Sequence, residues 1–210
     1  MSQEQRVIFR IITDGHMYRV PRMNAFDQMW VFKSIEPLFR GMAASVRNKP
    51  SAGGVDADLI LNEFASMTDE NLDGVISRAL RNAERFGDGG EWLEVWDQEA
   101  DQLLEGALSL QDLLQACAMI IWQNLRPFLT RDPFEFDRMG KRPPSFDAVT
   151  LPDGLSWLLT PVQRGMCRYE SLLDGTLTLN DVALMNDFLM AEGENESRAY
   201  KAAEENRDNR

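Results

Sequence analysis

Apolar residues recur along most of this chain at steps of three and four, which is the spacing of helices that bury one face against a core. Several of these runs follow a residue that favours the N-cap position, where a side-chain oxygen accepts a hydrogen bond from a free backbone N–H group. The pattern therefore predicts a mainly helical protein. The predicted N-cap residues are Asn24, Thr68, Ser109, Thr160 and Thr178.

Prolines and glycines set the expected limits of these helices. Pro37 lies inside the first run and should kink or divide it. The run after the second N-cap keeps its helical spacing as far as Phe86, where a cluster of glycines follows. Near the C-terminus, Pro161 suits the first position of a helix that continues to Leu173. With the helix that comes after it, this segment predicts a small helical hairpin.

Shorter segments of the chain alternate between apolar and polar residues, which is typical of strands. Residues 7–12 and 17–20 flank a good tight-turn pair at 14–15 and predict an antiparallel β-hairpin. Residues 92–96 also alternate, and residues 103–104 could pair with them across a polar turn. The predicted fold is mainly α with a small N-terminal β-hairpin, in the α+β class.

Prolines are concentrated in one part of the sequence. Six of the nine prolines fall between positions 127 and 161, and residues 140–144 cannot form a regular element. Such a composition is typical of a linker between domains. We therefore expect a helical N-terminal domain over 1–129, a proline-rich linker over 130–153, and a C-terminal helical module with a polar tail over 154–210.

Composition and charge narrow the function classes. With 210 residues, of which 44% are hydrophobic and 27% charged, the chain can bury a core without metals or disulfides. Its net charge of −12 argues against a nucleic-acid binder, because phosphate binding needs clustered cations. The N-terminus lacks the pattern of a secretory signal, and no apolar run reaches the length of a membrane span. We expect a soluble protein of a reducing cytoplasm, with neither nucleic acid nor membrane as a partner.

One motif resembles the first half of a calcium-binding loop. Asp69, Asn71 and Asp73 supply oxygen ligands at the first, third and fifth positions, and a glycine follows at the sixth. The twelfth position, where the loop needs a bidentate glutamate, is Leu80. The same residues fit the capped start of a helix, so we expect no metal site. A calcium-responsive or regulatory helical adaptor is kept as the alternative function.

No residue pattern in the sequence predicts catalysis or a cofactor. The one histidine, His16, is expected in the hairpin turn, and the two cysteines, Cys117 and Cys167, fall in helical patterns as small buried thiols. A cysteine nucleophile would need a neighbouring base. No glycine-rich phosphate loop is present either. The protein is therefore expected not to be an enzyme.

A long acidic segment is the strongest candidate for a binding surface. No lysine or arginine occurs between Arg85 and Arg126, while acidic residues accumulate there together with tryptophans. An acidic face with aromatic anchors would suit a basic or amphipathic partner. The alternative is a solvated acidic loop whose tryptophans belong to the core. The residues predicted to contact a partner are Trp92, Trp96, Glu91, Glu94, Asp97 and Glu99.

Residues 5–128 resemble the tail assembly chaperones of long-tailed bacteriophages. The resemblance rests on the order of several stretches: the hairpin DGHMYRVPRMNAFDQ, the helix MWVFKSIEPLF, then ASMTDENLDGVISRAL, WLEVW and the helix LSLQDLLQACAMIIWQNL. Residues 161–198 are similar to a small phage module of unassigned function, which phage tail operons typically encode directly downstream of the chaperone. Both modules on one chain resemble the longer chaperone form that programmed frameshifting makes, or a natural fusion.

The resemblance implies a function without catalysis. Members of the family bind the long, aggregation-prone tape measure protein before the tail tube forms, and the longer form recruits subunits of the tail tube (the major tail protein). The chain is therefore expected in the host cell cytoplasm and not in the mature virion. Its 11 methionines are compatible with this role, because Met-rich apolar surfaces can repack around many targets, although most of them are expected to fill the core. Self-association into a homo-oligomer is left open.

Overall fold

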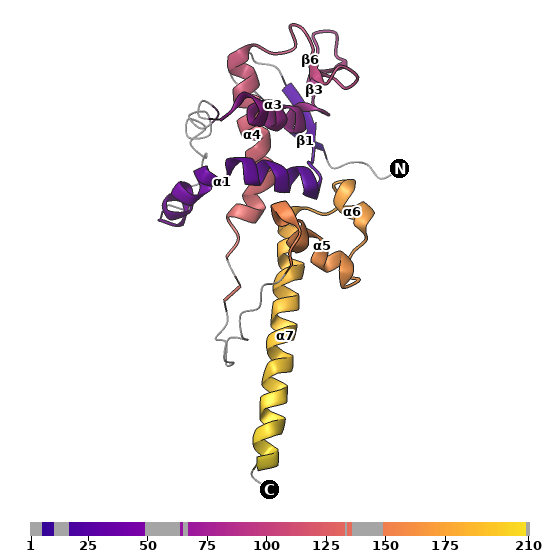
Figure 1. Ribbon diagram of the computed structural model, residues 1–210. Helices are drawn as coiled ribbons and strands as arrows, with labels where there is room; N and C mark the ends of the chain where they lie inside the picture. Colours follow the sequence, from indigo (N-terminus) through magenta and orange to yellow (C-terminus); the bar gives the residue numbers. More distant parts are fainter. Residues whose placement is uncertain are drawn as a thin grey trace.

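The computed structural model describes residues 6–10, 17–48, 64, 67–132, 134–135 and 149–208. It is mainly helical with a small antiparallel sheet, which confirms the predicted fold class (Figure 1). The strands are β1 (Arg6–Arg10), β2 (Met17–Pro21), β3 (Glu84–Phe86), β4 (Trp92–Glu94), β5 (Trp96–Asp97) and β6 (Gln102–Leu103). The helices are α1 (Ala25–Asn48), α3 (Asp69–Leu80), α4 (Leu110–Leu129), the 3₁₀ turn η1 (Pro152–Gly154), α5 (Leu155–Gln163), α6 (Tyr169–Leu173) and α7 (Leu179–Asp208).

The longer strands form one antiparallel sheet in the order β1-β2-β3-β4. The predicted N-terminal hairpin is confirmed, with Val7 opposite Val20 in the register of β1 and β2. The turn at 14–15 that joins these strands lies outside the described residues, as does His16. Strands β5 and β6 form a separate ribbon in which Trp96 pairs with Leu103, as predicted. The predicted single strand over 92–96 is two short strands, β4 and β5, which belong to different sheets.

The prediction that a helix continues to Phe86 is wrong. Helix α3 ends at Leu80, the N–H of Ala83 closes a turn onto the Leu80 carbonyl (2.8 Å), and Phe86 lies on β3. This strand pairs with β2 on one side and with β4 on the other. Pairing with distant strands decides the conformation of so short a segment. The helical spacing of Phe86 relative to the residues of α3 is therefore a coincidence.

Four of the helices begin at the predicted N-cap residues. At each of these helix starts, the side-chain oxygen of the N-cap residue accepts a hydrogen bond from the backbone N–H of the residue three positions later. The pairs are Asn24 with Asp27 (2.8 Å), Thr68 with Asn71 (3.4 Å), Ser109 with Asp112 (3.2 Å) and Thr178 with Asp181 (3.4 Å). At the start of α7 the bond is reciprocal, because the Asp181 carboxylate accepts from the Thr178 N–H at 2.8 Å.

Pro37 does not divide the first helix. Helix α1 contains the proline and runs on to Asn48, and Figure 1 shows the helix bent along its length. A proline inside a helix removes one backbone hydrogen bond and favours such a bend. Of the two expected effects, the bend therefore fits the structure and the division does not.

The C-terminal module is helical, but its first helix differs from the prediction. Helix α5 begins at Leu155, directly after Gly154 in the left-handed conformation (φ 76°), and Pro161 lies inside it. The prediction that Thr160 caps a helix starting at Pro161 is therefore wrong. The Thr160 hydroxyl instead donates to the backbone oxygen of Ser156 (2.7 Å). A separate short helix, α6, follows, so the predicted single helix is two.

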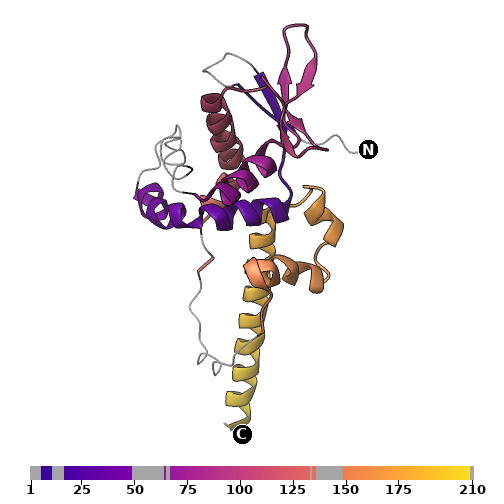
Figure 2. The same cartoon turned by 45° about the horizontal axis from the view of Figure 1, so that its top comes forward.

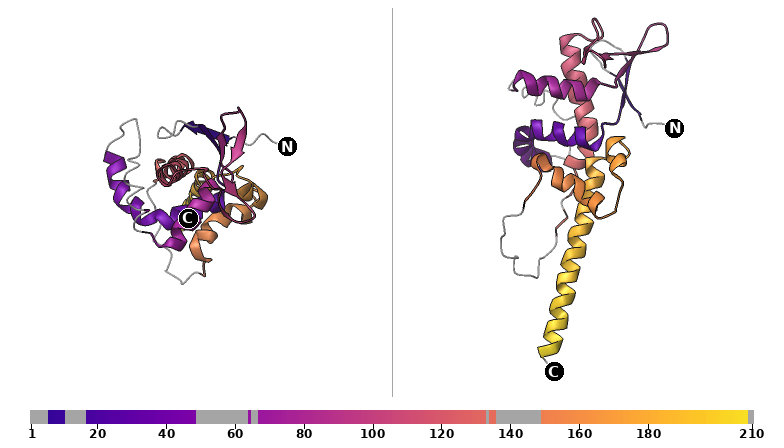
Figure 3. Two further views of the ribbon diagram at one scale, coloured as in Figure 1. Left: turned by 90° about the horizontal axis from the view of Figure 1, so that it is seen from above. Right: turned by 45° about the vertical axis from the view of Figure 1, so that its right-hand side comes forward.

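Both parts of the chain share one hydrophobic core. Helices α1, α3 and α4 pack against one another next to the sheet, and the C-terminal helices α6 and α7 lie against α1 and α4 (Figures 1 and 2). The second half of α7 extends away from the rest of the molecule (Figure 3). Because domains joined by a linker can also pack together, the proposed boundaries at 129 and 153 stay a prediction. Fully buried side chains from the two parts include Ile35, Leu80, Ile121, Leu158, Leu172 and Leu179.

Candidate partner-binding surface

The six predicted contact residues all lie on two neighbouring hairpins. In Figure 1 these hairpins, which contain β3 to β6, are at the end of the molecule opposite the projecting end of α7. The side chains differ in exposure: three glutamates are exposed, Trp92 and Asp97 are half-buried, and Trp96 is buried. The segment therefore provides both a surface and part of the core, and its residues have to be considered one by one. The exposed glutamates are Glu91, Glu94 and Glu99.

Trp96 belongs to the core, where it holds the β5–β6 ribbon in place. Its side chain is only 6% exposed, and its ring N–H donates to the Oδ1 oxygen of Asp101 at 3.2 Å. The same oxygen accepts a hydrogen bond from the hydroxyl of Ser77 on α3 at 3.1 Å. Asp101 adopts a positive φ of 48°, which brings its carboxylate back toward the helix. The sequence pattern singled out the tryptophan but missed this aspartate, because the contact depends on the turn conformation.

Trp92 lies on the outer face of the sheet. Residues two apart on a strand share a face, and Phe86 pairs with Trp92 in the antiparallel register. The two rings meet edge to face with centroids 5.1 Å apart. On the next strand but one, the guanidinium of Arg19 lies over the Trp92 ring at 4.6 Å from the ring centre. Two flanking contacts therefore fix the orientation of this tryptophan.

Arg19 is itself held by a two-point ion pair. Its Nη2 group donates to Oε1 of Glu84 at 2.7 Å, and its Nε group contacts the other carboxylate oxygen. Hydrogen bonding to Glu84 raises the pKa of Arg19 above its ordinary value, which keeps the guanidinium charged. A charged guanidinium over an indole ring gives a cation–π contact. Strands β2, β3 and β4 are thus joined on this face by side chains as well as by backbone pairing.

The apolar residues Met17, Phe86 and Trp92, together called the sheet face here, lie beside the Arg19–Glu84 ion pair and are partly open to solvent. Met17 is 42% exposed and Phe86 is 39% exposed. Met17 shares the face because it is two residues from Arg19 on β2. Sequence reasoning missed Met17 and Phe86, although the alternation of residues 17–20 was visible, because Phe86 also fits a helical stripe. An exposed patch of apolar and aromatic residues with a polar rim is typical of protein-binding surfaces.

Acidic residues border this sheet face along β4 and the adjoining turns. Asp88, Glu91 and Glu94 are exposed beside it, and further exposed acids follow in the β5–β6 region. The negative charge therefore belongs to the β3–β4 side, where a partner with positive charge would be favoured.

The calcium-like motif forms the N-terminal part of a helix. Asp69, Asn71 and Asp73 lie in α3, which is helical from Asp69 onward and capped by Thr68. In a helix these residues point in different directions around the axis, whereas a calcium loop brings its ligands together. Within the ranges that the structure describes, no cluster of three or more His, Cys, Asp or Glu side chains could hold a metal ion.

The cysteines lie apart from the acidic hairpins. Cys117 is fully buried on α4, and burial raises the pKa of its thiol far above the ordinary value. Cys167 is half-buried between α5 and α6, and partial burial raises the pKa of its thiol as well. Both thiols are therefore protonated near neutral pH, and a protonated thiol is a poor nucleophile.

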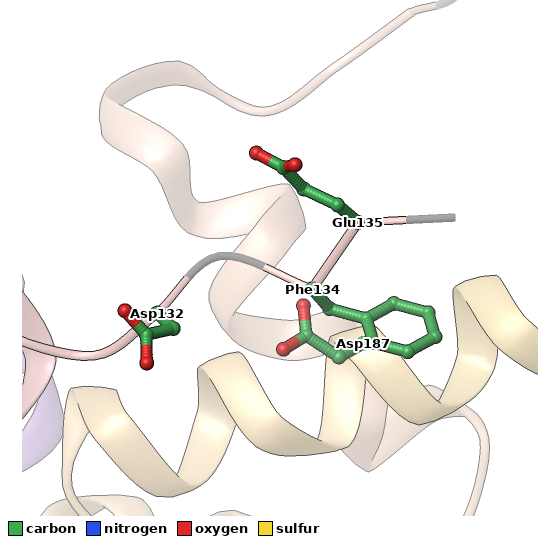
Figure 4. A pocket seen from close by; sticks show the side chains of 4 residues that line it. All are labelled: Asp132, Phe134, Glu135 and Asp187. Atoms are coloured by element: carbon green, nitrogen blue, oxygen red, sulfur yellow. The ribbon is translucent and has the colours of Figure 1, made fainter. Parts of the chain in front are cut away.

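An open hollow lies between α7 and the chain that follows α4 (Figure 4). Figure 4 shows the carboxylate of Asp187 on α7 close to the ring of Phe134. Asp187 forms an ion pair with Arg131, which ties the two segments together. The hollow is lined by Asp132, Phe134, Glu135 and Asp187. These groups join two parts of the chain and offer no pairing of a nucleophile with a base.

Two family models match different parts of the chain. The model described as phage tail assembly chaperone protein, TAC, matches residues 14–135, and a family of unknown function (DUF6889) matches residues 167–206. No curated protein and no solved structure matches the chain. The first region includes the sheet face and the acidic hairpins, and the second includes α6 and most of α7. Within the described residues, no helix is long and apolar enough to cross a membrane.

Proposed function

Because the tail assembly chaperone model covers more than half of its length, the chain belongs to the phage tail assembly chaperone family, and we propose that it binds and solubilises the tape measure protein. This family membership is the observation that carries the proposal. The protein acts in the host cell cytoplasm as a binding protein, not an enzyme. It dissociates from the tail during assembly and is not part of the mature virion. The C-terminal module helps to recruit subunits of the tail tube, since the far end of α7 extends beyond the body that holds the other helices (Figure 3).

The acidic hairpins are the proposed contact surface for the tape measure protein. Exposed Glu91, Glu94 and Glu99 would attract basic amphipathic segments, and attraction between opposite charges speeds the encounter of two proteins. Trp92 would then serve as the aromatic anchor, because it lies on the open sheet face with Phe86 beside it. Trp96 and Asp97 support this surface from β5, where Trp96 is buried.

Affinity purification from co-expressing cells tests this function. A tagged copy of the chain is expressed with the phage's tape measure protein in one culture and with its tail tube protein in another. We expect the tape measure protein to co-purify from the soluble fraction, and the tube protein to be captured by the full chain more strongly than by a chain ending at residue 190. Failure of the tape measure protein to co-purify at low salt would contradict the proposed function. Equal capture of the tube protein by both chains would contradict the role of α7.

A further inference from the structure

The matched regions of the two families meet in a specific interface. The ring of Phe26 contacts the ring of Tyr169 edge to face, with centroids 5.6 Å apart. Both residues lie inside matched regions, Phe26 in the chaperone region and Tyr169 in the region of unknown function. The ion pair between Arg131 and Asp187 joins the same two regions at another point. The contacts between the modules are therefore made by residues inside the two matched regions and not only by the segment that connects them.

A buried glutamine is the polar centre of this interface. Gln28 on α1 is fully buried, and its amide nitrogen donates to the backbone oxygen of Met23 at 2.8 Å. Its amide oxygen accepts a hydrogen bond from the backbone N–H of Leu179 at 3.0 Å. Leu179 is the first residue of α7, and the N–H groups of a first helical turn lack partners within the helix. The chaperone region thus supplies a hydrogen bond that the module's long helix needs.

Apolar packing around this hydrogen bond is close. Leu172, Leu179 and Val182 of the C-terminal module are each 0% exposed and belong to the core shared with α1 and α4. At Gly175, with φ +77°, an added Cβ atom would lie 3.2 Å from the backbone oxygen of Arg22. Only a residue without a side chain combines this backbone conformation with such a close approach. The two surfaces are complementary in shape as well as in hydrogen bonding.

We propose that the α1–α4 surface of the chaperone region is a docking site for modules of the DUF6889 type, and that docking does not require the two to share a chain. The partner is recognised by the free N–H at the start of its long helix, by the apolar residues of that helix's first turns, and by the acidic Asp187. This assigns the family of unknown function a role as a subunit that binds tail assembly chaperones. This docking does not depend on which tail protein the chaperone region binds.

A break in the full chain tests the proposal. A recognition sequence for a specific protease is inserted between residues 140 and 144, and the folded protein is cut. We expect the two fragments to stay together in gel filtration and to appear as a one-to-one complex in native mass spectrometry. Mixing with an isotope-labelled cut sample should produce exchanged complexes. Fragments that separate after cutting, while each keeps its helical circular dichroism, would overturn the proposal.

A charge swap tests the specificity of the interface. In the cut protein, Arg131→Glu places two like charges together and should weaken the association of the fragments by about tenfold or more, and adding Asp187→Arg should restore it. Because both side chains are near the surface, neither change should prevent folding.

On α7, Val182→Asp should abolish association, whereas Leu184→Asp, at a site 64% exposed, is the matched control and should not. Failure of the double variant to recover, or equal effects of the two α7 changes, would contradict the proposed docking site.

Discussion

The side-chain nitrogen of Asn186 on α7 donates a hydrogen bond to the backbone oxygen of Trp157 on α5, at 3.1 Å. In a regular helix that oxygen would accept from the N–H four residues later, but position 161 is a proline and has none. The same nitrogen also donates to the backbone oxygen of Val182 at 3.0 Å. Asn186 therefore allows a buried proline to lie inside α5, and it joins the two helices at that point.

Replacing Asn186 with alanine should lower the free energy of unfolding by about 1–3 kcal/mol, because it removes the hydrogen bond to the partly buried carbonyl of Trp157. Asn195→Ala is the matched control, since Asn195 lies on the exposed part of α7. Urea denaturation followed by circular dichroism measures both changes. A control variant as unstable as Asn186→Ala would contradict this account of the hydrogen bond.

Local signals in the sequence predicted the helix starts well. Ser109 and Asp112, for example, are three residues apart, and the cap depends on almost nothing else. The prediction at Pro161 failed for the opposite reason. A proline is favoured at a helix start because the N–H group that it lacks has no partner there. Pro161 lies inside α5 instead, and the hydrogen bond that it cannot donate to the Trp157 carbonyl is replaced by one from Asn186 on α7. Asn186 lies 29 positions from Trp157 along the sequence, so this hydrogen bond leaves no local signal.

The candidate surface was predictable in charge but not in exposure. The absence of lysine and arginine from 86 to 125 is visible in the sequence, and the structure places most of these acids in solvent. Alternation along residues 92–96 indicated a strand, yet the burial of Trp96 depends on Asp101 and Ser77, which lie in a turn and on another helix. Phe86 was assigned to the wrong element for the same kind of reason, since its strand exists through distant pairing.

The two tryptophans should respond differently to truncation. Trp96→Ala removes a buried ring and should lower the free energy of unfolding by about 3–5 kcal/mol. Trp92→Ala should have a smaller effect on stability but weaken binding of the tape measure protein by about 2 kcal/mol, if Trp92 is the anchor of the sheet face. Thermal melting measures the first effect, and titration calorimetry on the folded variants measures the second. Wild-type affinity in Trp92→Ala would place the contact surface elsewhere.

The acidic hairpins should make binding sensitive to salt. Changing Glu91, Glu94 and Glu99 together to glutamine removes three exposed negative charges, so the association rate should fall and depend less on ionic strength. Glu192, Glu196 and Glu204 are exposed acids on the far part of α7, and their replacement by glutamine is the matched control. Stopped-flow or surface-based kinetics at several salt concentrations measure the rates. An equal fall in both triple variants would show that net charge matters and the hairpins do not.

The two cysteines should differ in reactivity toward a thiol reagent. Burial raises the pKa of both thiols, but Cys167 is half-buried while Cys117 is completely enclosed on α4. Because the thiolate is the reactive form, labelling of Cys167 should speed up as pH rises above neutral. Cys117 should be labelled only when the protein unfolds in denaturant. Mass spectrometry measures the labelling of each cysteine over time. Equal labelling rates for the two cysteines in the folded state would contradict the burial of Cys117.

Calcium should have no effect on the protein, since Asp69 and Asp73 belong to the regular helix α3 and not to a metal-binding loop. Replacing both with asparagine should lower the free energy of unfolding by no more than about 1 kcal/mol each, through the loss of negative charge near the helix N-terminus. Tryptophan fluorescence during a calcium titration checks the response of the wild type. Saturable micromolar binding that disappears in the double variant would favour the alternative of a calcium-responsive adaptor.

The central claim is that this chain keeps the tape measure protein soluble, and the soluble fraction of that protein tests it most directly. The tape measure protein is expressed in host cells alone, with the wild-type chain, or with Trp92→Ala, and the amount in supernatant and pellet is measured after lysis. We predict that most of it is in the pellet when expressed alone, that most is in the supernatant with the wild-type chain, and that the variant gives an intermediate result. A tape measure protein that is equally insoluble with and without the wild-type chain would contradict the proposed function.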